Sequence, residues 1–321
     1  MANAYTGTAA VSNVVQTAYD RMVEFSLRSQ PLFRQVADKK PAEQAMPGSS
    51  VVLEIYQDLA QVTSTLTETV DPDATAIGNP STVSITLNEY GNVVLQTRLL
   101  NLFSFTDVAP AITNQVAYNM ANSIDLVVQN VLRAGITNVI QENGGLLVPS
   151  GGTITNIVGT DVIKSRDLRA GVAQLRNNQA VPKKNSLYYA AIHPLVSYDL
   201  RSETGDTGWR QPHDYSAPGS IWAGEIGEYE GAFYVETPRA FSAQAGNGSG
   251  TSQIRVFNTY LLGQQALAEA LSEEFHVVFG PVVDKLMRFR PVGWYGVAGW
   301  SIYRTQASQM IQTAATLRQT V

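Results

Sequence analysis

The chain has 321 residues, and only 15% of them are charged, whereas about a quarter of the residues of a typical soluble protein carry charge. The balance of 22 Lys and Arg against 27 Asp and Glu argues against a basic nucleic-acid-binding protein, and the aromatic and β-branched residues spread along the chain exclude a disordered one. Because there is no cysteine, disulfide scaffolds, thiol catalysis and cysteine-ligated zinc are excluded as well.

No segment approaches the roughly 18 consecutive apolar residues that a membrane-spanning helix needs. The first residues, MANAYTGTAAVSNVV, contain neither a positively charged start nor a continuous apolar run, so we expect no secretory signal. The sequence therefore predicts no membrane partner.

Residues 1–47 are predicted to form an arm rather than a domain. Apolar residues recur at helical spacing within 13–36, and Gln30-Pro31 ends this pattern. The Met46-Pro47-Gly48 turn then marks a boundary. The arm holds too few large apolar residues to build a core of its own.

Alternating side chains predict a long β-hairpin after this arm. One arm of the hairpin combines residues 51–56 with a threonine ladder over 62–67, and the return strand covers 82–87. An acidic, Pro- and Gly-rich turn lies between them, and a further strand follows Gly91. Because a two-stranded hairpin is marginally stable in water, we expect this one to lie on another surface and to contribute nothing to the subunit core.

Residues 106–134 give the strongest helical pattern. Thr106 or Asp107 can cap the helix, Pro110 is tolerated in its first turn, and Gly135 closes it. Apolar residues recur every four positions along one stripe, whereas the opposite face is polar but almost uncharged. We therefore expect protein on both sides of this helix.

The remaining chain alternates between predicted helices and strands. Arg166, Arg169 and Arg176 lie on the outer face of the first of these helices. The predicted elements are a loop at 143–152, helices at 161–178 and 193–201, a loop at 205–224, a hairpin at 227–237, a flexible tip at 246–250, and strands at 186–192, 254–262, 276–283 and 286–304. Together they predict an α+β fold.

The sequence offers no catalytic, cofactor-binding or metal-binding constellation. His193, His213 and His276 are far apart and lack partners at helical spacing. We expect His193 to be a packed or capping residue, and no nucleophile elbow accompanies His213 and its neighbour Asp214.

Two other patterns favour structural roles over chemistry. The carboxylate pairs Glu273-Glu274 and Asp71-Asp73 could bind a cation, but solvated carboxylates explain them more simply. The aromatic residues between Trp294 and Tyr303 alternate along an apolar strand, which is typical of a core.

The order of the predicted elements resembles the major capsid proteins of tailed bacteriophages, which have the Hong Kong 97 fold. Three stretches resemble that family in particular: SLYYAAIHPLVSYDLRSE, IWAGEIGEYEGAFYVETPRA and RPVGWYGVAGWSIYR. The resemblance covers essentially the whole chain, and it identifies no catalytic signature.

The resemblance implies a layout and a function. Residues 1–47 would be the N-terminal arm, 48–100 the extended E-loop, 101–185 the P-domain with its spine helix, 186–264 the A-domain, and 265–321 the returning strands that complete both domains. The chain would assemble into an icosahedral shell in the bacterial host cytoplasm and enclose packaged double-stranded DNA.

The chain departs from some family members in two ways. No lysine occurs between Lys40 and Lys164, so the Lys–Asn crosslink that some members form from the E-loop is not available to it. Because the arm begins at Met1, we expect scaffolding to come from a separate protein and no cleavage of this chain.

The expected partners are other copies of the chain in hexamers and pentamers, a separate scaffolding protein, a portal and a decoration protein. Contact with DNA would be weak and non-specific, because the chain is acidic overall. We predict that the acidic turn of the hairpin meets arginines of a neighbouring subunit; the candidates are Glu68, Asp71 and Asp73 with Arg166, Arg169, Arg288 and Arg290.

Two alternatives stay open at this point. One is a β-rich protein that binds or processes carbohydrate through Trp209, Trp222, Trp294 and Trp300. The other is a phage tail or tube protein, which would polymerise helically. Deletion of residues 60–88 is expected to leave a folded subunit that forms no shells.

Overall fold

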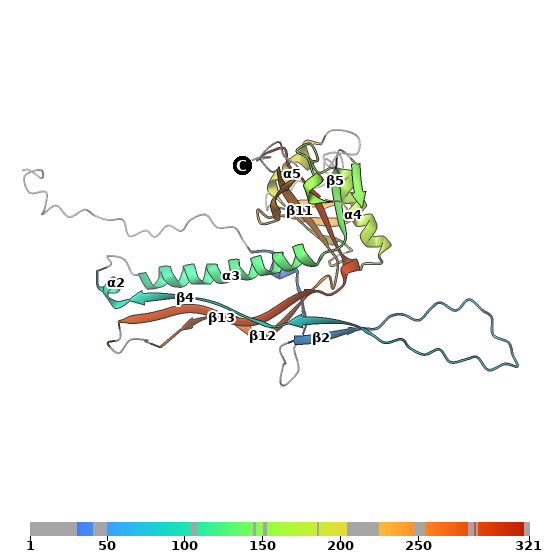
Figure 1. The fold of residues 1–321 in the computed structure, drawn as a ribbon, viewed down its shortest axis with the longest axis horizontal. Helices are drawn as coiled ribbons and strands as arrows, with labels where there is room; N and C mark the ends of the chain where they lie inside the picture. Colours follow the sequence, from blue (N-terminus) through green and yellow to red (C-terminus); the bar gives the residue numbers. More distant parts are fainter. Residues whose placement is uncertain are drawn as a thin grey trace, which may run out of the picture.

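A computed structural model describes residues 31–40, 50–103, 108–143, 146–149, 153–184, 186–203, 225–246, 254–281, 286 and 288–317. Figure 1 shows a long lobe in which one helix lies over an extended sheet, and a second, more compact lobe above one end of it. A loop projects from that same end, away from the rest of the long lobe. This mixed arrangement of sheets and few helices agrees with the predicted α+β class.

The long lobe is built on a sheet of four strands in the order β1-β12-β13-β4. β13 (Phe289–Ile302) runs antiparallel to both β12 (Leu267–Phe279) and β4 (Asn88–Thr97). The short strand β1 (Asp38–Lys40) adds to β12 in parallel. A helix of one turn, α1 (Phe33–Val36), precedes β1, and α2 (Arg98–Phe103) follows β4.

Helix α3 (Val108–Gly135) covers one face of this sheet (Figure 1). Its 28 residues agree with the predicted helix, and the predicted stripe is buried at Val116, Ile124 and Val128 and partly buried at Ile112 and Met120. Trp294 of β13 packs with Val116 of the helix, and Trp300 belongs to the cluster around Val128. The prediction that these tryptophans are core residues is confirmed.

The polar face of α3 finds many of its partners inside the subunit. Asn119 Oδ1 accepts hydrogen bonds from Trp294 Nε1 at 3.0 Å and from Asn92 Nδ2 at 3.1 Å. Gln129 donates to the backbone carbonyl of Arg239, whose guanidinium donates to Asn122. The helix therefore has protein on both sides, as expected, but at these positions the second side belongs to the same chain.

The predicted hairpin is much shorter than its sequence pattern. β2 (Ser50–Ile55) pairs antiparallel with β3 (Ser81–Thr86), with the predicted faces inward. The predicted strand over 62–67 is wrong, because residues 56–80 form no strand. Pro72, Gly78 and Pro80 interrupt the opposite limb, so the threonine ladder has no partner backbone within the subunit.

The base of this hairpin belongs to the subunit core, contrary to the prediction. Ile85 is fully buried and packs on Ala268 and Ala270 of β12. A Cβ at Gly299 of β13 would lie 2.2 Å from the carbonyl oxygen of Thr86, so only glycine permits this close approach. Deletion of 60–88 would remove the buried Ile85, and a deletion confined to the loop is the correct test of its role.

The compact lobe is built on a wide sheet in the order β6-β5-β14-β11-β7-β9-β8, with β10 also paired to β11. Helices α4 and α5 cover its apolar cluster, and the predicted inward residues of α4, such as Leu168 and Leu175, are buried. The bounds are β5 (Val139–Asn143), β6 (Leu146–Pro149), α4 (Ser165–Asn177), β7 (Tyr188–Ile192), α5 (Pro194–Ser202), β8 (Glu225–Tyr229), β9 (Ala232–Glu236), β10 (Phe241–Gly246), β11 (Ile254–Leu262) and β14 (Ser308–Thr313), with 3-10 turns η1 (Ile154–Asn156) and η3 (Thr305–Ala307).

Two parts of this sheet differ from the sequence prediction. The predicted loop at 143–152 includes β6, which forms a hairpin with β5. The second difference is β14, which the residue pattern does not predict because its residues, SQMIQT, are mostly polar. They are nevertheless buried, and Gln312 Oε1 accepts a hydrogen bond from Gln141 Nε2 at 2.7 Å. Amide pairing within the sheet thus replaces the apolar signal on which the prediction depended.

Several predicted features lie outside the described residues. They are most of the 13–36 helix, the Thr106 or Asp107 cap, the 205–224 loop with Trp209, His213 and Trp222, and the tip beyond Gly246.

Residues 31–40 connect the two lobes through buried charges. Asp125 of α3 is 1% exposed and accepts from the backbone N–H groups of Leu32 at 2.8 Å and Phe33 at 2.6 Å. Its other oxygen accepts from Arg239 Nη1 of the compact lobe at 2.8 Å. Arg34 pairs with the buried Glu269 of β12 at 2.9 Å. The Asp125 carboxylate in the middle of α3 thus binds both the segment 31–40 and the compact lobe.

We predict that Asp125→Ala lowers the free energy of unfolding by about 3 kcal/mol, because it leaves a largely buried arginine and two backbone donors without their acceptor. Asn130→Ala is the control, since Asn130 is an exposed residue of the same helix and its replacement should change stability by less than about 0.5 kcal/mol. Chemical denaturation of the dissociated subunits measures both. Equal losses for the two variants would contradict the role of Asp125.

Candidate assembly surfaces

The acidic loop, residues 56–80, projects from one end of the subunit (Figure 1). Every side chain from 56 to 79 is exposed, including the predicted contact residues Glu68, Asp71 and Asp73. Large apolar residues are exposed here too, with Val62 at 80% and Leu66 at 77%. Several large apolar side chains exposed on one loop are typical of an interaction surface.

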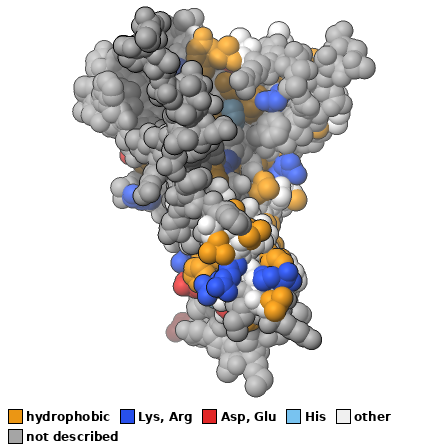
Figure 2. Space-filling view, turned by 90° about the vertical axis from the view of Figure 1, so that its left-hand side faces the viewer, with side chains coloured by type: hydrophobic (Ala, Val, Ile, Leu, Met, Phe, Trp, Pro, Cys, Tyr) orange, Lys and Arg blue, Asp and Glu red, His pale blue; other side chains and the backbone are white. Residues whose placement is uncertain are grey.

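The opposite end of the long lobe carries exposed arginines and leucines. Arg288 and Arg290, two of the four predicted arginines, are exposed there, and the backbone N–H of Arg98 donates to the Arg288 carbonyl at 2.8 Å. Figure 2 shows hydrophobic and basic side chains side by side at this end. This surface, called the basic end, consists of Arg98, Leu99, Leu100, Leu102, Leu286, Arg288 and Arg290.

Sequence reasoning missed Arg98 and the leucines around it. These residues form α2, a helix of 6 residues between β4 and the undescribed residues before α3. The run RLLNLF shows neither strand alternation nor the spacing of a long amphipathic helix. Three leucines within four positions next to an arginine were the available signal.

The other two predicted arginines have ion-pair partners inside the subunit. Arg166 Nε donates to Glu142 Oε1 at 3.0 Å, and Arg169 Nε lies 3.0 Å from Glu230 Oε1. Both side chains remain 40–45% exposed, as their predicted outward orientation requires. A carboxylate of a neighbouring subunit would therefore have to compete with an existing partner at Arg166 and at Arg169.

Two carboxyl groups are buried together beneath Arg166. Glu142 of β5 and Asp167 of α4 are both 0% exposed, and Asp167 Oδ2 accepts from the Lys164 backbone N–H at 2.8 Å. Burial, followed by the hydrogen bond and the negative charge of Glu142, raises the pKa of Asp167 to about 8. At neutral pH the Asp167 carboxyl therefore keeps its proton and donates a hydrogen bond to Glu142, which connects α4 to β5.

The histidines and acidic pairs form no catalytic or metal-binding arrangement in the described part of the chain. His193 Nδ1 accepts from the Leu195 N–H at 3.1 Å and caps α5, as predicted. Burial and the charge of Arg255 lower the pKa of His193 to about 4. No group of three or more His, Asp or Glu among the described residues could hold a metal ion. Within the same residues, no helix has the length and apolar character of a membrane span.

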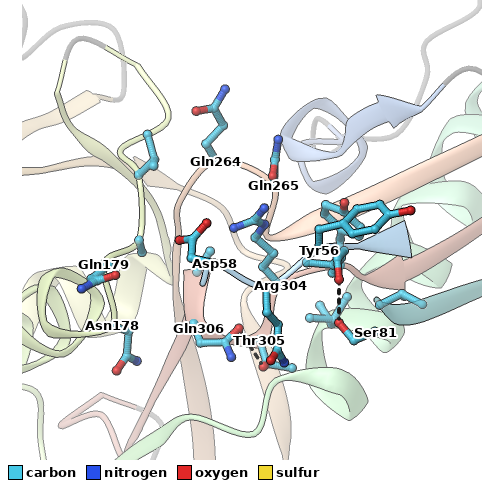
Figure 3. Close-up of a pocket in the computed structure, with 18 residues that line it drawn as sticks. Tyr56, Asp58, Ser81, Asn178, Gln179, Gln264, Gln265, Arg304, Thr305 and Gln306 are labelled. Carbon is cyan, nitrogen blue, oxygen red and sulfur yellow. Dashed lines mark hydrogen bonds between the residues drawn. The ribbon is translucent and has the colours of Figure 1, made fainter. Parts of the chain in front are cut away.

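A cavity of about 860 Å³ lies where the hairpin meets the compact lobe. Figure 3 shows Asp58 and Arg304 between Gln179 on one side and Tyr56 on the other. The rest of the wall is rich in amides, and its lining includes Asn178, Gln264, Gln265 and Gln306. These amides offer hydrogen bonds, and the hydroxyl of Ser81, which also lines the cavity, donates to the Ile55 carbonyl at 3.3 Å.

The family follows from a comparison with known sequences. A model of the phage capsid protein family matches residues 6–307. The chain belongs to this family. It is a major capsid protein, a structural component of the phage virion. A search of curated protein sequences finds no significant match.

Solved structures give the same fold for this capsid protein at low sequence identity. The capsid asymmetric unit of cyanophage Pam1 matches with a TM-score of 0.72 and 14% identity, covering 99% of this chain and 100% of the other. The capsid of Helicobacter pylori bacteriophage KHP30 gives 0.67 and 13%, covering 98% and 99%. Mycobacterium phage Che8 gives 0.63 and 15%, covering 94% and 98%.

The family disfavours the carbohydrate alternative. Phage capsid proteins are structural, and their function lies in surfaces that bind other subunits. Trp294 and Trp300, which a carbohydrate site would need to expose, are 5% and 7% exposed in this capsid protein.

The buried carboxyl pair predicts how the stability of the subunit depends on pH. The pKa of Asp167 is higher in the folded state than its ordinary value of 3.8, so the folded protein binds this proton more tightly. The contribution of the Asp167 proton to the free energy of unfolding is therefore complete at low pH, and it decreases as the pH rises from about 4 to about 8. Asp167→Asn keeps a hydrogen-bond donor toward Glu142 but removes the titration.

We expect the melting temperature of Asp167→Asn minus that of the wild type to rise by several degrees between pH 4 and pH 8 and to level off above pH 8. Thermal unfolding of dissociated subunits across this range measures the difference. A difference that stays constant with pH would show that Asp167 does not titrate in this window.

Proposed function

We propose that this capsid protein forms the icosahedral head shell of a tailed bacteriophage and that its subunits contact one another through opposite ends. The observation that carries the proposal is the distribution of charge and apolar surface along the molecule. The acidic loop lies at one end and the basic end at the other (Figure 1). Contacts between unlike surfaces of identical subunits close into rings when the rotation permits, as hexamers and pentamers require.

The Hong Kong 97 layout is part of this proposal, with boundaries that follow the sheets. The E-loop comprises residues 50–86, because β4 lies in the long sheet rather than in the hairpin. The P-domain is that sheet with α3, and the A-domain is the wide sheet with α4 and α5. Residues 1–47 remain the proposed N-terminal arm, of which 31–40 bind between the lobes.

The proposed partners beyond the subunit itself are a separate scaffolding protein, a portal and a decoration protein, with assembly in the bacterial host cytoplasm. Packaged double-stranded DNA would be confined rather than bound. The net charge of −5 supports this view, because phosphate binding requires an excess of cationic side chains. Without a lysine between 40 and 164, the contacts of the E-loop would be non-covalent.

We predict that replacing Glu68, Asp71 and Asp73 by lysine lowers the yield of shells by roughly tenfold or more, because the acidic loop would then repel the basic end. The subunit should remain folded, since all three side chains are exposed. Negative-stain microscopy counts the shells, and circular dichroism reports the fold.

The matched control replaces Glu228, Glu273 and Glu274, also exposed, by lysine with the same change in charge. A further variant adds Arg98→Glu, Arg288→Glu and Arg290→Glu to the loop triple and should restore part of the yield. Normal shells from the loop triple would contradict the proposed pairing, as would equal losses in both triples.

Replacement of residues 58–79 by Asn-Gly tests the loop without disturbing the hairpin base. We predict a folded subunit with nearly unchanged stability that forms no shells, because the removed side chains are all exposed. Deletion of 60–88 should instead destabilise the subunit by about 2–5 kcal/mol through the loss of Ile85 and its strand. Denaturation and negative-stain microscopy of both variants distinguish these roles, and wild-type shell formation by the loop replacement would contradict the proposal.

A further inference from the structure

Strand β4 presents an open backbone edge along the long lobe. Among the described residues its strand partner is β13 on one side, and no strand lies on the other. The Val93 N–H donates to the adjacent Asn92 side chain at 2.9 Å rather than to a strand. Val93 and Leu95 share one face of the strand and are 60% and 59% exposed. An open, apolar edge strand is a template for pairing with another chain.

The other open edge of the same sheet carries protection that β4 lacks. Beyond its pairing with β1, which ends at Ala270, β12 continues through the exposed Glu273 and Glu274. Its register against β13 shifts twice in this part. Charges and irregularities of this kind prevent edge-to-edge pairing. β4 contains no Lys, Arg or Pro, and its one charged residue is Glu89 at the start, so pairing at this edge is unopposed.

The acidic loop contains a segment with the pattern of a strand but no partner. Val62, Ser64 and Leu66 alternate with three threonines, a composition typical of strands. The segment is nevertheless unpaired in the subunit and fully exposed. This segment cannot pair with β4 of its own subunit, because the loop projects from the other end of the molecule (Figure 1).

We propose that residues 62–67 of one subunit pair as a parallel strand with β4 of a neighbouring subunit. The inference rests on the proposed function, because it needs a second copy of the chain. Charge sets the direction: β4 runs toward the basic end, where Arg98 follows Thr97. Only a parallel segment places Glu68, Asp71 and Asp73 beyond that end, next to its arginines.

Apolar contact sets the register. With Leu66 beside Leu95, Ser64 lies beside Val93 and Val62 beside Gly91, because paired strands advance together. All six residues then share the open face of the sheet, opposite α3. Glu68 lies beside Thr97, one residue before Arg98. The pairing would bury two leucines that are each more than half exposed in the subunit.

Disulfide crosslinking tests this arrangement cleanly, because the chain has no cysteine of its own. The variant Leu66→Cys/Leu95→Cys is co-assembled with an equal amount of wild-type chain, so that shell formation does not depend on the variant, and is then oxidised. Adjacent residues of paired strands lie within disulfide range. We expect linked dimers and higher oligomers on a denaturing gel, formed in shells and not in dissociated subunits.

Two matched variants of similarly exposed residues are the controls. Val62→Cys/Leu95→Cys would crosslink in an antiparallel pairing, and Thr65→Cys/Leu95→Cys would crosslink if the opposite face of the segment pointed to Leu95. Both should form roughly tenfold less crosslink than the first pair. Shells without the 66–95 crosslink, or with equal crosslinking in a control, overturn the pairing alone. Wild-type chain that forms no shells even when its scaffolding protein is supplied overturns the proposed function as well.

Discussion

Helix α3 packs along strand β13, and this contact determines where the other elements lie. Trp294 and Trp300 attach the strand to the helix, and Asn119 binds the indole of Trp294. The same helix carries Asp125, which holds the chain entering the long lobe and Arg239 of the compact lobe. Helix α3 and strand β13 thereby form one rigid unit that positions both lobes, the hairpin base and the two ends of the molecule.

This rigid unit also explains why the capsid protein needs neighbours. A helix of 28 residues on a narrow sheet makes a long body with much surface for its volume. The ends of such a body cannot fold back on its core, so leucines and valines remain exposed in the acidic loop, along β4 and at the basic end. The low fraction of charged residues has two sources. These exposed surfaces are largely apolar, and many polar positions inside the subunit are hydrogen-bonded amides, such as Gln129 and Gln141.

The sequence predicted those elements whose pattern arises from their own burial. The α3 stripe, the inward residues of α4, the capping role of His193 and the aromatic core of β13 all follow from local periodicity. Prediction from the sequence failed where the structure of a segment depends on the residues that pair with it. The 62–67 segment alternates like a strand but pairs with no strand among the described residues, and β14 is a buried strand whose Gln312 binds the side-chain amides of Gln141 and Asn258. The basic end was not predicted from the sequence, because α2 is too short for a helical periodicity to appear.

If the two ends of neighbouring subunits cover each other in the shell, the exchange of their amide hydrogens must slow on assembly. Comparing amide hydrogen exchange between dissociated subunits and assembled shells measures this change. We expect residues 57–79, the β4 amides that point away from β13 and residues 99–103 to exchange rapidly in the subunit and to become strongly protected in the shell, whereas the β4 amides bonded to β13 and the buried core of α3 are protected in both states. Equal, rapid exchange of the loop and the basic end in both states would contradict this expectation.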